Sequence, residues 1–421
     1  MLAMNYIPRL IDSELKQDLE IFGSIIIEGP KWVGKTTSAK VVSKSVINIQ
    51  DPDHREEYLE MAKFKPSLLL EGSTPRLIDE WQDVPELWDA VRMAVDNRDE
   101  PGQFILTGSV IVDKTKICHT GTGRIYSLKM GTLSLLESGD SAGSISLRGL
   151  FNGSQQIEGV SEKTTEDIAK FIVRGGWPKS IGVSDAAALK LVKGYCDRII
   201  DTEISEGSGT RHDNNRVRAV MKSLSRSISA PLSKTNIIKD ISSDISLTEN
   251  TLDTYLKALR EIYVLQELEA WSPNLRSKTA VRTADTVHFC DPAIAAYFLS
   301  ASPGDLLRDL HTFGLLFESL VIRDLRTYVQ FLDGEVFHYR DKTGLEADAI
   351  IHLHDGRWAA IEVKLGGNWV DEAAANLLKL KDRVDSEKMG EPAFLAVVTG
   401  TQYAYTREDG VHVIPITLLG P

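Results

Sequence analysis

The chain has 421 residues, a formal net charge of −12, 42% apolar residues and 26% charged residues. This length predicts two to four domains, and the apolar content is ample for packed cores. The acidic balance argues against a protein whose whole surface coats nucleic acid, although it leaves room for a local basic patch.

The cysteines and the absence of long apolar runs indicate the expected cellular location. Cys118, Cys196 and Cys290 are far apart and odd in number, so they predict neither a metal cluster nor a disulfide framework. Residues 1–10 contain no long apolar core and no cleavage signal, and no run approaches the roughly 18 apolar residues that a membrane span needs. We therefore expect a soluble, cytoplasmic protein with no membrane partner.

A phosphate-binding motif stands near the start of the chain. Apolar residues near helical spacing predict a helix over residues 7–21, and a short apolar strand is expected over residues 24–27. The sequence G-P-K-W-V-G-K-T follows at residues 29–36 and opens a helix over residues 35–43. A glycine-rich turn of this kind, between a strand and a helix, is typical of a loop that binds phosphates.

Each residue type in this loop has a physical role. Gly29 and Gly34 let the backbone approach the phosphates without a Cβ in the way. Main-chain N–H groups then point at the anion, assisted by the N-terminus of the helix. The Lys35 ammonium can reach the β- and γ-phosphates, and the Thr36 hydroxyl can bind Mg²⁺. The residues expected to hold the nucleotide are Gly29, Pro30, Lys31, Trp32, Val33, Gly34, Lys35, Thr36 and Thr37.

An acidic pair follows a later strand. Strands are expected over residues 46–49 and 76–78, with a charged helix over residues 53–63 between them. Asp79, at the end of the second strand, would hold Mg²⁺ through water, and Glu80 would polarise the attacking water. The alternative is an acidic pair on the surface with no catalytic role.

Further polar residues follow the next strand, expected over residues 103–106. Thr107 and Ser109 either sense the γ-phosphate or serve as simple turn residues. Arg124 precedes a strand expected over residues 125–129. It is either a contact to the γ-phosphate, in its own chain or in a neighbour's, or an ordinary surface arginine.

Several ordered motifs carry a family resemblance. The motifs G-P-K-W-V-G-K-T-T, L-I-D-E-W-Q and F-I-L-T-G-S, followed by G-R before a strand, resemble a prokaryotic branch of the AAA-superfamily ATPases. In that branch a C-terminal domain of unknown function follows the ATPase, and the resemblance covers nearly the whole chain. It implies a five-stranded parallel sheet with helices on both faces, ATP as the nucleotide, and the Walker B role for Asp79 and Glu80.

The middle of the chain begins with a break in pattern. Residues 138–161 are rich in Ser and Gly and predict a loop or hinge that leads out of the ATPase. Helices are expected over residues 165–173 and 186–203. Between them the break G-G-W-P, at residues 175–178, also resembles the family.

A basic stretch runs from Arg211 to Lys239. It holds seven lysines and arginines against Asp213 alone, which gives a local balance of +6. Such a stretch can bind the phosphates of DNA.

Helices and a strand in this region form a winged-helix pattern. The helices are expected over residues 217–227, 232–241 and 249–260, and the strand over residues 263–270. The third helix would enter a DNA major groove with Asn250, Thr251, Thr254 and Lys257 facing out. Winged helices also bind proteins or only pack, and Glu249, Asp253 and Glu261 on the exposed face would repel phosphate.

The last part of the chain predicts a β-rich domain. Helices are expected over residues 313–328 and 371–383, and strands over residues 335–340, 346–353, 358–364 and 393–399. Asp348 lies on the second strand, and Glu362 and Lys364 lie on the third, where residues two apart share a face. Two carboxylates and a lysine that converge can hold Mg²⁺, activate water and stabilise a pentavalent phosphate.

The spacing D-x₁₃-E-x-K resembles that of restriction-endonuclease-like nucleases. Glu318, on the preceding helix, matches their frequent additional acidic residue, so the resemblance implies metal ligands at Glu318, Asp348 and Glu362. Glu346 is a fourth acid, which we expect to face away. The alternative is a nuclease fold that is retained for binding, with these charges paired to each other.

The sequence therefore predicts an α/β protein in four parts. They are an AAA-type ATPase domain with a parallel sheet at residues 1–137, a hinge and helical segment at 138–204, a winged-helix-like domain at 205–278 and an endonuclease-like α/β domain at 279–421.

The function indicated is an ATPase, with ATP and Mg²⁺, whose nucleotide state controls a nuclease-like domain. DNA would be contacted through the basic stretch, the winged helix and the C-terminal domain. One alternative is a regulatory switch that binds a protein partner, or a further copy of itself, without cleavage. Another is a signalling nucleotidase with no polymer substrate.

Overall fold

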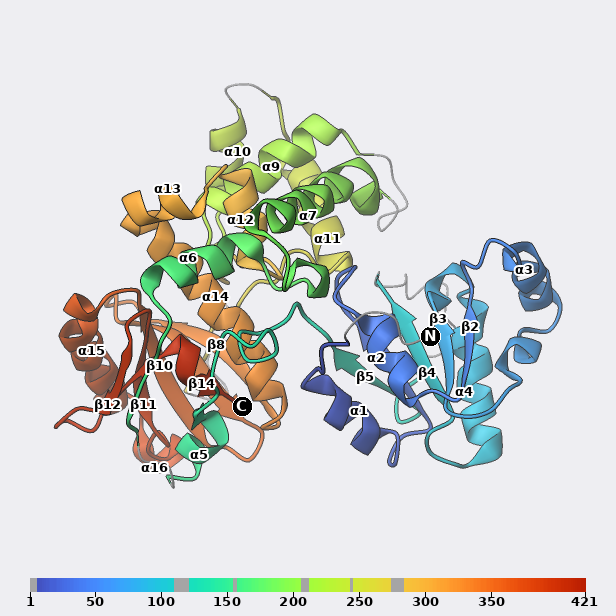
Figure 1. Cartoon of the computed structure of the whole chain (residues 1–421), viewed down its shortest axis with the longest axis horizontal. Helices are drawn as coiled ribbons and strands as arrows, with labels where there is room; N and C mark the ends of the chain where they lie inside the picture. Colours follow the sequence, from blue (N-terminus) through green and yellow to red (C-terminus); the bar gives the residue numbers. More distant parts are fainter. Residues whose placement is uncertain (1–5, 110–120, 154–156, 206–211, 243–244, 274–283) are drawn as a thin grey trace. The chain divides into compact units, whose positions relative to one another are not determined.

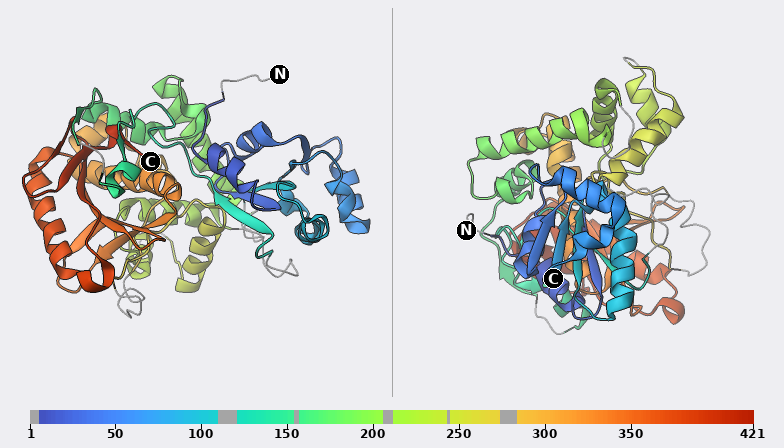
Figure 2. Two further views of the ribbon diagram at one scale, coloured as in Figure 1. Left: turned by 90° about the horizontal axis from the view of Figure 1, so that it is seen from below. Right: turned by 90° about the vertical axis from the view of Figure 1, so that its right-hand side faces the viewer.

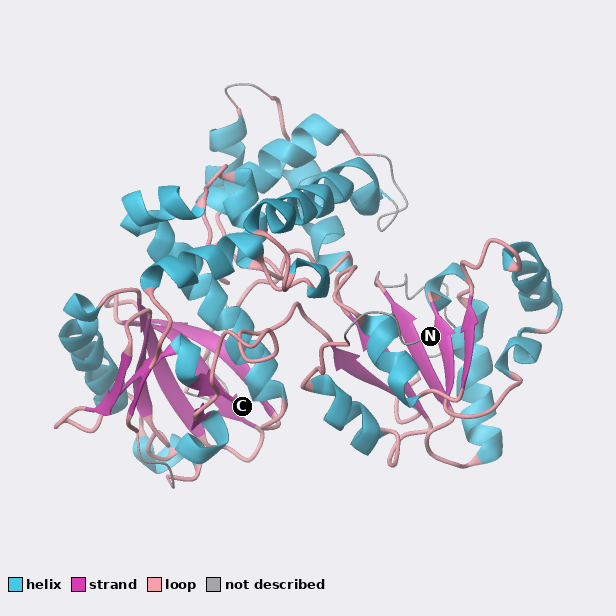
Figure 3. Cartoon of the chain, in the orientation of Figure 1, coloured by secondary structure: helices cyan, strands magenta, loops and turns pink. Residues whose placement is uncertain are grey.

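The computed structural model describes residues 6–109, 121–153, 157–205, 212–242, 245–273 and 284–421. Cys118 and Arg211 lie outside the described residues. The chain divides into two compact units, of which the first is Met1–Gly131 with Glu261–Tyr263 and the second is Thr132–Arg260 with Val264–Pro421. Both units combine helices and strands (Figure 3). The four-part division stays a prediction.

The first unit is built on a parallel sheet with the order β2-β3-β4-β1-β5 (Figure 1). Its strands are β1 (Ser24–Glu28), β2 (Ser45–Asn48), β3 (Arg76–Asp79), β4 (Phe104–Gly108) and β5 (Ile125–Lys129). Its helices are α1 (Ile11–Asp18), α2 (Lys35–Val42), α3 (Arg55–Phe64) and α4 (Glu86–Arg98), with the 3₁₀ turns η1 (Pro66–Leu70) and η2 (Trp81–Asp83). All four strand pairings are parallel, which confirms the expected five-stranded parallel sheet.

Burial explains why the central strands are nearly continuous apolar runs. β1 and β4 are buried along almost their whole length, whereas the edge strand β2 buries only Ile47. Ile26, Ile78 and Leu106 pack with Leu87 of α4 in one cluster. Figure 2 shows helices on both sides of this sheet. Because neither face of the central strands meets water, their sequences need no alternation of apolar and polar residues.

The second unit contains a mixed sheet with the order β7-β12-β13-β11-β10-β9-β8. Its strands are β7 (Gly159–Val160), β8 (Gly334–Arg340), β9 (Glu346–Leu353), β10 (Trp358–Lys364), β11 (Leu395–Thr399), β12 (Tyr403–Thr406) and β13 (His412–Pro415). The small strands β6 (Ile145–Ser146) and β14 (Leu419–Gly420) form a separate pair. β8, β9 and β10 are antiparallel neighbours, and β10, β11 and β13 are parallel neighbours.

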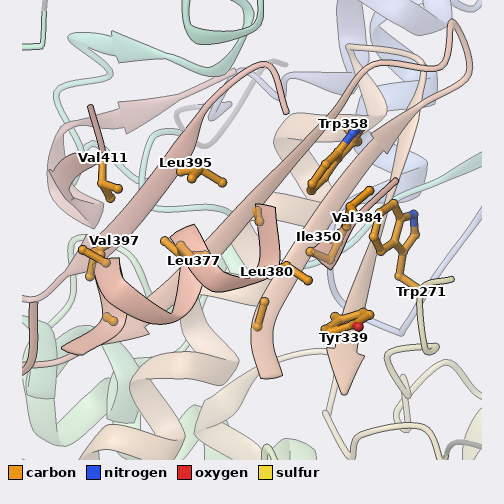
Figure 4. Close-up of a cluster of buried hydrophobic side chains, with 14 of the residues drawn as sticks. Trp271, Tyr339, Ile350, Trp358, Leu377, Leu380, Val384, Leu395, Val397 and Val411 are labelled. Carbon is orange, nitrogen blue, oxygen red and sulfur yellow. The ribbon is translucent and has the colours of Figure 1, made fainter. Parts of the chain in front are cut away.

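Helices make up the rest of the second unit. They are α5 (Leu147–Phe151), α6 (Thr165–Arg174), α7 (Asp185–Arg198), α9 (Asn214–Arg226), α10 (Lys234–Ile241), α11 (Glu249–Glu261), α12 (Pro292–Phe298), α13 (Pro303–Arg308), α14 (Leu310–Gln330), α15 (Val370–Arg383) and α16 (Ser386–Met389). Short turns are η4 (Pro178–Ser180), η5 (Ile199–Glu203), η7 (Gly367–Trp369) and η8 (Ile416–Leu418). Leu377 and Leu380 of α15 pack with Ile350 and Trp358 of the sheet in one core (Figure 4).

The stretch predicted as a hinge, residues 138–161, is a structured part of the second unit. It contains β6, α5 and β7. β7 pairs with β12 at the edge of the large sheet, and β6 pairs with β14 at the end of the chain. The loop-or-hinge prediction missed these elements, because strands of two residues leave no alternating pattern in a Ser- and Gly-rich sequence; a hinge role for this stretch stays a prediction.

The strand predicted as a β-wing, residues 263–270, is also not formed. Leu265, Leu268 and Ala270 make only isolated bridges, to Phe289, Thr286 and His338 respectively. The three helices before it are present as α9, α10 and α11, and Thr248 accepts a hydrogen bond from the Thr251 N–H at 3.3 Å, as expected of a helix cap.

A buried ionic network holds the second unit together around Arg323. Its guanidinium donates to Asp291 Oδ2 at 3.1 Å and to Asp324 Oδ1 at 2.6 Å, and both carboxylates are fully buried. Asp291 Oδ2 also accepts from the Thr132 hydroxyl and the Gly176 N–H. The network therefore joins segments that are far apart in sequence.

We expect Arg323→Ala to lower the free energy of unfolding by about 3–5 kcal/mol, because it leaves two buried carboxylates without their cation. Arg308→Ala is the matched control: Arg308 pairs with Asp305 in solvent, its side chain is 75% exposed, and the expected change is below about 0.5 kcal/mol. Urea unfolding followed by circular dichroism measures both. Equal midpoints for the two variants would contradict a central role for this network.

Candidate functional site

The phosphate loop joins the end of β1 to the start of α2. Gly29 has a φ of 151°, and a Cβ there would lie 2.0 Å from the Met130 carbonyl oxygen. Gly34 has a φ of 104° and directly precedes α2. Both positions therefore require glycine. Trp32, within the loop, has a φ of 68° and is 52% exposed.

The Lys35 ammonium lies inside the loop. Its Nζ donates to the carbonyl oxygens of Gly29 at 2.7 Å and Pro30 at 2.8 Å, and the residue is buried. The loop thus wraps around the positive charge that would meet the β- and γ-phosphates. Lys31 and Val33 lie in the same loop, and Thr37 lies in the first turn of α2.

Strand register brings the polar residues of three elements together. Thr107 is opposite Asp79 on one side and Ile27 on the other, since β4 lies between β3 and β1. Asp79 Oδ1 accepts hydrogen bonds from Thr36 Oγ1 at 2.7 Å and from Thr107 Oγ1 at 2.5 Å. A threonine hydroxyl and a carboxylate next to a phosphate site are oxygen ligands that suit Mg²⁺.

Glu80, the residue after Asp79, has a backbone conformation in the left-handed region. Its φ is 57°, and its Oε2 accepts a 2.5 Å hydrogen bond from Gln82 Nε2. Burial raises the pKa of the Glu80 carboxyl, against the opposing effects of the Gln82 hydrogen bond and the Lys35 charge. Gln82 therefore orients the candidate base. Gln82 is the last residue of the motif L-I-D-E-W-Q, but no role was predicted for it, because only the acidic pair of that motif was considered.

Arg124 does not lie at the phosphate loop of its own chain. It immediately precedes β5, whose first residue, Ile125, is opposite Ser24 at the start of β1. The loop follows the other end of β1. Arg124 Nε instead donates to Asp96 Oδ1 at 2.8 Å. Of the three alternatives, this position disfavours a contact to the nucleotide of the same chain, whereas a contact to a neighbour's nucleotide stays a prediction and the exposed pair with Asp96 is what an ordinary surface arginine would make. Ser109 is buried just beyond β4, and its role as a sensor also stays a prediction.

The predicted acids of the second unit gather around Lys364. Its Nζ lies 2.6 Å from Glu362 Oε2 and 3.4 Å from Asp348 Oδ2. Asp348 Oδ2 also accepts a hydrogen bond from the Val363 N–H at 2.6 Å. Glu362 is 2% exposed, and its second oxygen, Oε1, is buried without a hydrogen-bond partner. The sequence thus correctly predicted the convergence of these three side chains.

Two carboxyl groups here have strongly altered acidity. Burial and the Asp348 charge raise the pKa of Glu362 to about 8, although Lys364 opposes this. The pKa of Glu318 is also raised, with burial as the first cause and the Asp348 charge as the second. In both groups burial disfavours the charged form more than the Lys364 ammonium favours it.

The geometry does not include a ready-made metal cage. Among the residues that the structure describes, no three His, Cys, Asp or Glu side chains are arranged to hold a metal ion. Glu346, expected to face away, shares the face of Asp348 by strand alternation, and its carboxylate lies 3.8 Å from Arg340.

The predicted basic stretch is partly neutralised. Its described ion pairs are Arg216 with Asp213, Arg218 with Asp197, Arg226 with Asp240, and Lys234 with Asp253 and Glu249. On α11 the polar residues Asn250, Thr254 and Lys257 are exposed, as expected, whereas Thr251 is half-buried.

Family models match three consecutive parts of the chain. Residues 22–138 match the AAA domain, residues 165–305 a domain of unknown function (DUF8612), and residues 313–419 a second domain of unknown function (DUF4143). Residues 22–138, most of which lie in the first unit, are therefore similar to AAA-type P-loop ATPase domains. This assignment agrees with the loop geometry and supports binding and hydrolysis of a nucleotide.

The chain is also similar to individual proteins. It is 22% identical to the uncharacterized proteins Mb2031c of Mycobacterium bovis and Rv2008c of Mycobacterium tuberculosis over 358 residues, which is 84% of this chain and 72% of each relative. Among solved structures it is similar to the Walker-type ATPase PABY2304 of Pyrococcus abyssi, with 14% identity, 70% of this chain and 96% of that chain covered, and a TM-score of 0.42. No described helix has both the length and the apolar character that crossing a membrane requires.

The raised pKa of Glu362 predicts a pH dependence of stability. The folded protein keeps this proton up to about pH 8, whereas an ordinary glutamate loses it near 4.5, so stability falls as the pH rises through this window. Glu362→Gln should remove this slope, which is at most about 1.4 kcal/mol per pH unit. Urea unfolding between about pH 5 and 8 measures it. Glu391→Gln, at an exposed ion pair, is the control, and parallel curves for Glu362→Gln and the parent would refute the shift.

Proposed function

We propose that the protein is an ATPase that binds ATP and Mg²⁺ at residues 29–36 and couples hydrolysis to its second unit. The observation that supports this most directly is the meeting of Thr36, Asp79 and Thr107 beside a lysine that the loop encloses. A nucleoside triphosphate would exchange the loop carbonyls around Lys35 for its own phosphate oxygens. Thr36 and Asp79 would hold Mg²⁺, which would neutralise charge on the phosphates.

Glu80 is the proposed general base. Burial raises its pKa and the Gln82 amide fixes its direction, so it is suited to accept a proton from water. The water oxygen would bond to the γ-phosphorus as the bond to the leaving ADP oxygen breaks. Thr107 would hold Asp79 in place during this step.

A second activity is proposed for the cluster at Lys364: cleavage of DNA phosphodiesters with a divalent cation. The specific observation in favour is the orphaned Oε1 of buried Glu362, beside more carboxyl groups than Lys364 compensates. Asp348 and Glu362 would hold the cation, and Glu318 would join them only after moving. α11 and the basic stretch would contact the DNA backbone. If nothing is cut, the same unit serves as a switch that binds a protein partner.

Lys35→Ala should abolish ATP binding, because it removes the only side-chain cation of the motif that reaches the β- and γ-phosphates. Glu80→Gln should bind ATP within about threefold of the parent but hydrolyse it at least about a hundredfold more slowly. Isothermal titration calorimetry and a phosphate-release assay measure the two effects. Lys40→Ala, an exposed lysine on the same helix, should behave as the parent. Parent-like hydrolysis by Glu80→Gln would remove its role as the base.

Purified protein with Mg²⁺ or Mn²⁺ should nick supercoiled plasmid, and Lys364→Ala should lower the rate at least about a hundredfold by removing the cation that faces the scissile phosphate. Agarose gels measure the rate. Lys381→Ala is the control, since Lys381 belongs to an exposed ion pair of α15. Nicking that survives Lys364→Ala would show that cleavage occurs elsewhere, and no nicking by the parent would leave the switch as the function.

A further inference from the structure

An arginine that belongs to no nucleotide-binding motif holds the phosphate loop from outside. Arg9 lies just before α1 and is only 7% exposed. Its Nη1 donates to the Val33 carbonyl oxygen at 2.7 Å, and its Nη2 donates to the Gly131 carbonyl oxygen at 3.0 Å. One rigid guanidinium therefore bridges the loop and the segment that follows β5.

The bond to Val33 fixes the direction of a main-chain donor. In a trans peptide the C=O of one residue and the N–H of the next point in opposite directions. A Val33 carbonyl that faces Arg9 therefore turns the Gly34 N–H the other way, away from the guanidinium. A phosphate cradle needs its N–H groups turned toward the anion. Gly34 has little intrinsic preference for one orientation, so an external hydrogen bond can decide it.

Arg9 is itself anchored in the first unit. Asp12 Oδ2 accepts from the Arg9 N–H at 2.8 Å and from the Tyr6 hydroxyl at 2.6 Å. The Tyr6 hydroxyl lies 3.0 Å from Ser38 Oγ of α2. The segment that carries Arg9 is thus fixed to the helix that begins at the phosphate loop, and the guanidinium has little freedom to leave Val33.

The second carbonyl bonded to Arg9 belongs to Gly131, the residue directly before the second unit begins at Thr132. After Gly131 the Thr132 hydroxyl donates to Asp291 at 2.8 Å, and the Leu133 N–H donates to the Gly176 carbonyl at 2.7 Å. The Leu135 N–H donates to Asp324 Oδ2 at 2.9 Å. The stretch 131–135 is therefore bonded to Arg9 at its first residue and to the Arg323 network at the next ones.

We propose that Arg9 is a positioning residue that sets the Gly34 N–H for phosphate binding and transmits nucleotide occupancy to residues 131–135. Phosphate contact at Gly34 strengthens the orientation in which Val33 accepts from Arg9. The guanidinium is then held more firmly, and so is the Gly131 carbonyl on its other side. This inference rests on the proposed ATP binding.

The first test compares Arg9→Gln and Arg9→Lys with the parent. Arg9→Gln should raise the Kd for ATP at least about tenfold and leave the Kd for AMP, which lacks the β- and γ-phosphates, within about twofold. Arg9→Lys keeps the positive charge but lacks the two guanidinium nitrogens that bond two carbonyls at once, so its Kd for ATP should lie between those of the parent and Arg9→Gln. Arg92→Gln, at exposed pairs on α4, is the matched control. A fall in Tm with an unchanged Kd for ATP would make Arg9 merely structural and overturn the proposal.

The second test is hydrogen–deuterium exchange of peptides that cover residues 130–137. In the parent, a non-hydrolysable ATP analogue should slow exchange at the Leu133 and Leu135 amides, and in Arg9→Gln at a saturating concentration it should not. A nucleotide effect that persists in Arg9→Gln, or is missing from the parent, would overturn the transmission. Failure of the proposed ATP binding would look different from failure of the Arg9 proposal. If the loop does not bind ATP, the parent and Lys35→Ala would bind ATP equally poorly.

Discussion

The parallel register of β3, β4 and β1 is the constraint on which the candidate ATP site depends. Parallel strands end at the same edge of a sheet, so residues that follow each strand must meet there. Asp79 and Thr107 come together because their strands are neighbours, and Thr36 joins them because the loop after β1 returns to the same edge. The same register excludes Arg124 from this edge, since it precedes its strand.

Hydrogen bonds from side chains to the main chain then decide the shape of the loop. The Lys35 ammonium, inside the loop, donates hydrogen bonds to the carbonyl oxygens of Gly29 and Pro30. The Arg9 guanidinium, outside the loop, donates to the carbonyl oxygen of Val33. Buried carbonyls need donors, so each of these bonds fixes the orientation of one peptide group. The Val33 bond also orients the N–H of the next residue, Gly34, whereas Pro30, which follows Gly29, has no N–H to orient.

Local patterns in the sequence were sufficient for the long elements and for the motifs. β1, α14 and β10 carry strong periodic or continuous apolar signals, and Asp348, Glu362 and Lys364 converge as strand geometry requires. The rest depended on contacts between distant residues. Arg9 meets partners 24 and 122 positions away, and β7 is a strand only because β12 pairs with it. No local pattern contains such information.

The second unit contains two buried ionic clusters, around Arg323 and around Lys364. They differ in whether their carboxylate oxygens all have hydrogen-bond partners. Around Arg323 the described carboxylate oxygens accept bonds from the guanidinium, the Thr132 hydroxyl, and the N–H groups of Gly176 and Leu135. Such a cluster has no capacity left for a ligand. Around Lys364 the Oε1 of Glu362 has no partner, and burial, followed by the Asp348 charge, raises the pKa of that carboxyl to about 8.

A buried polar atom without a hydrogen-bond partner costs stability unless a ligand satisfies it. An arriving cation would satisfy the orphaned oxygen and lower the pKa of Glu362 together, whereas it would gain nothing at Arg323. The proposal for Lys364 therefore rests on the unpartnered oxygen and raised pKa of Glu362 as well as on the resemblance to a nuclease motif.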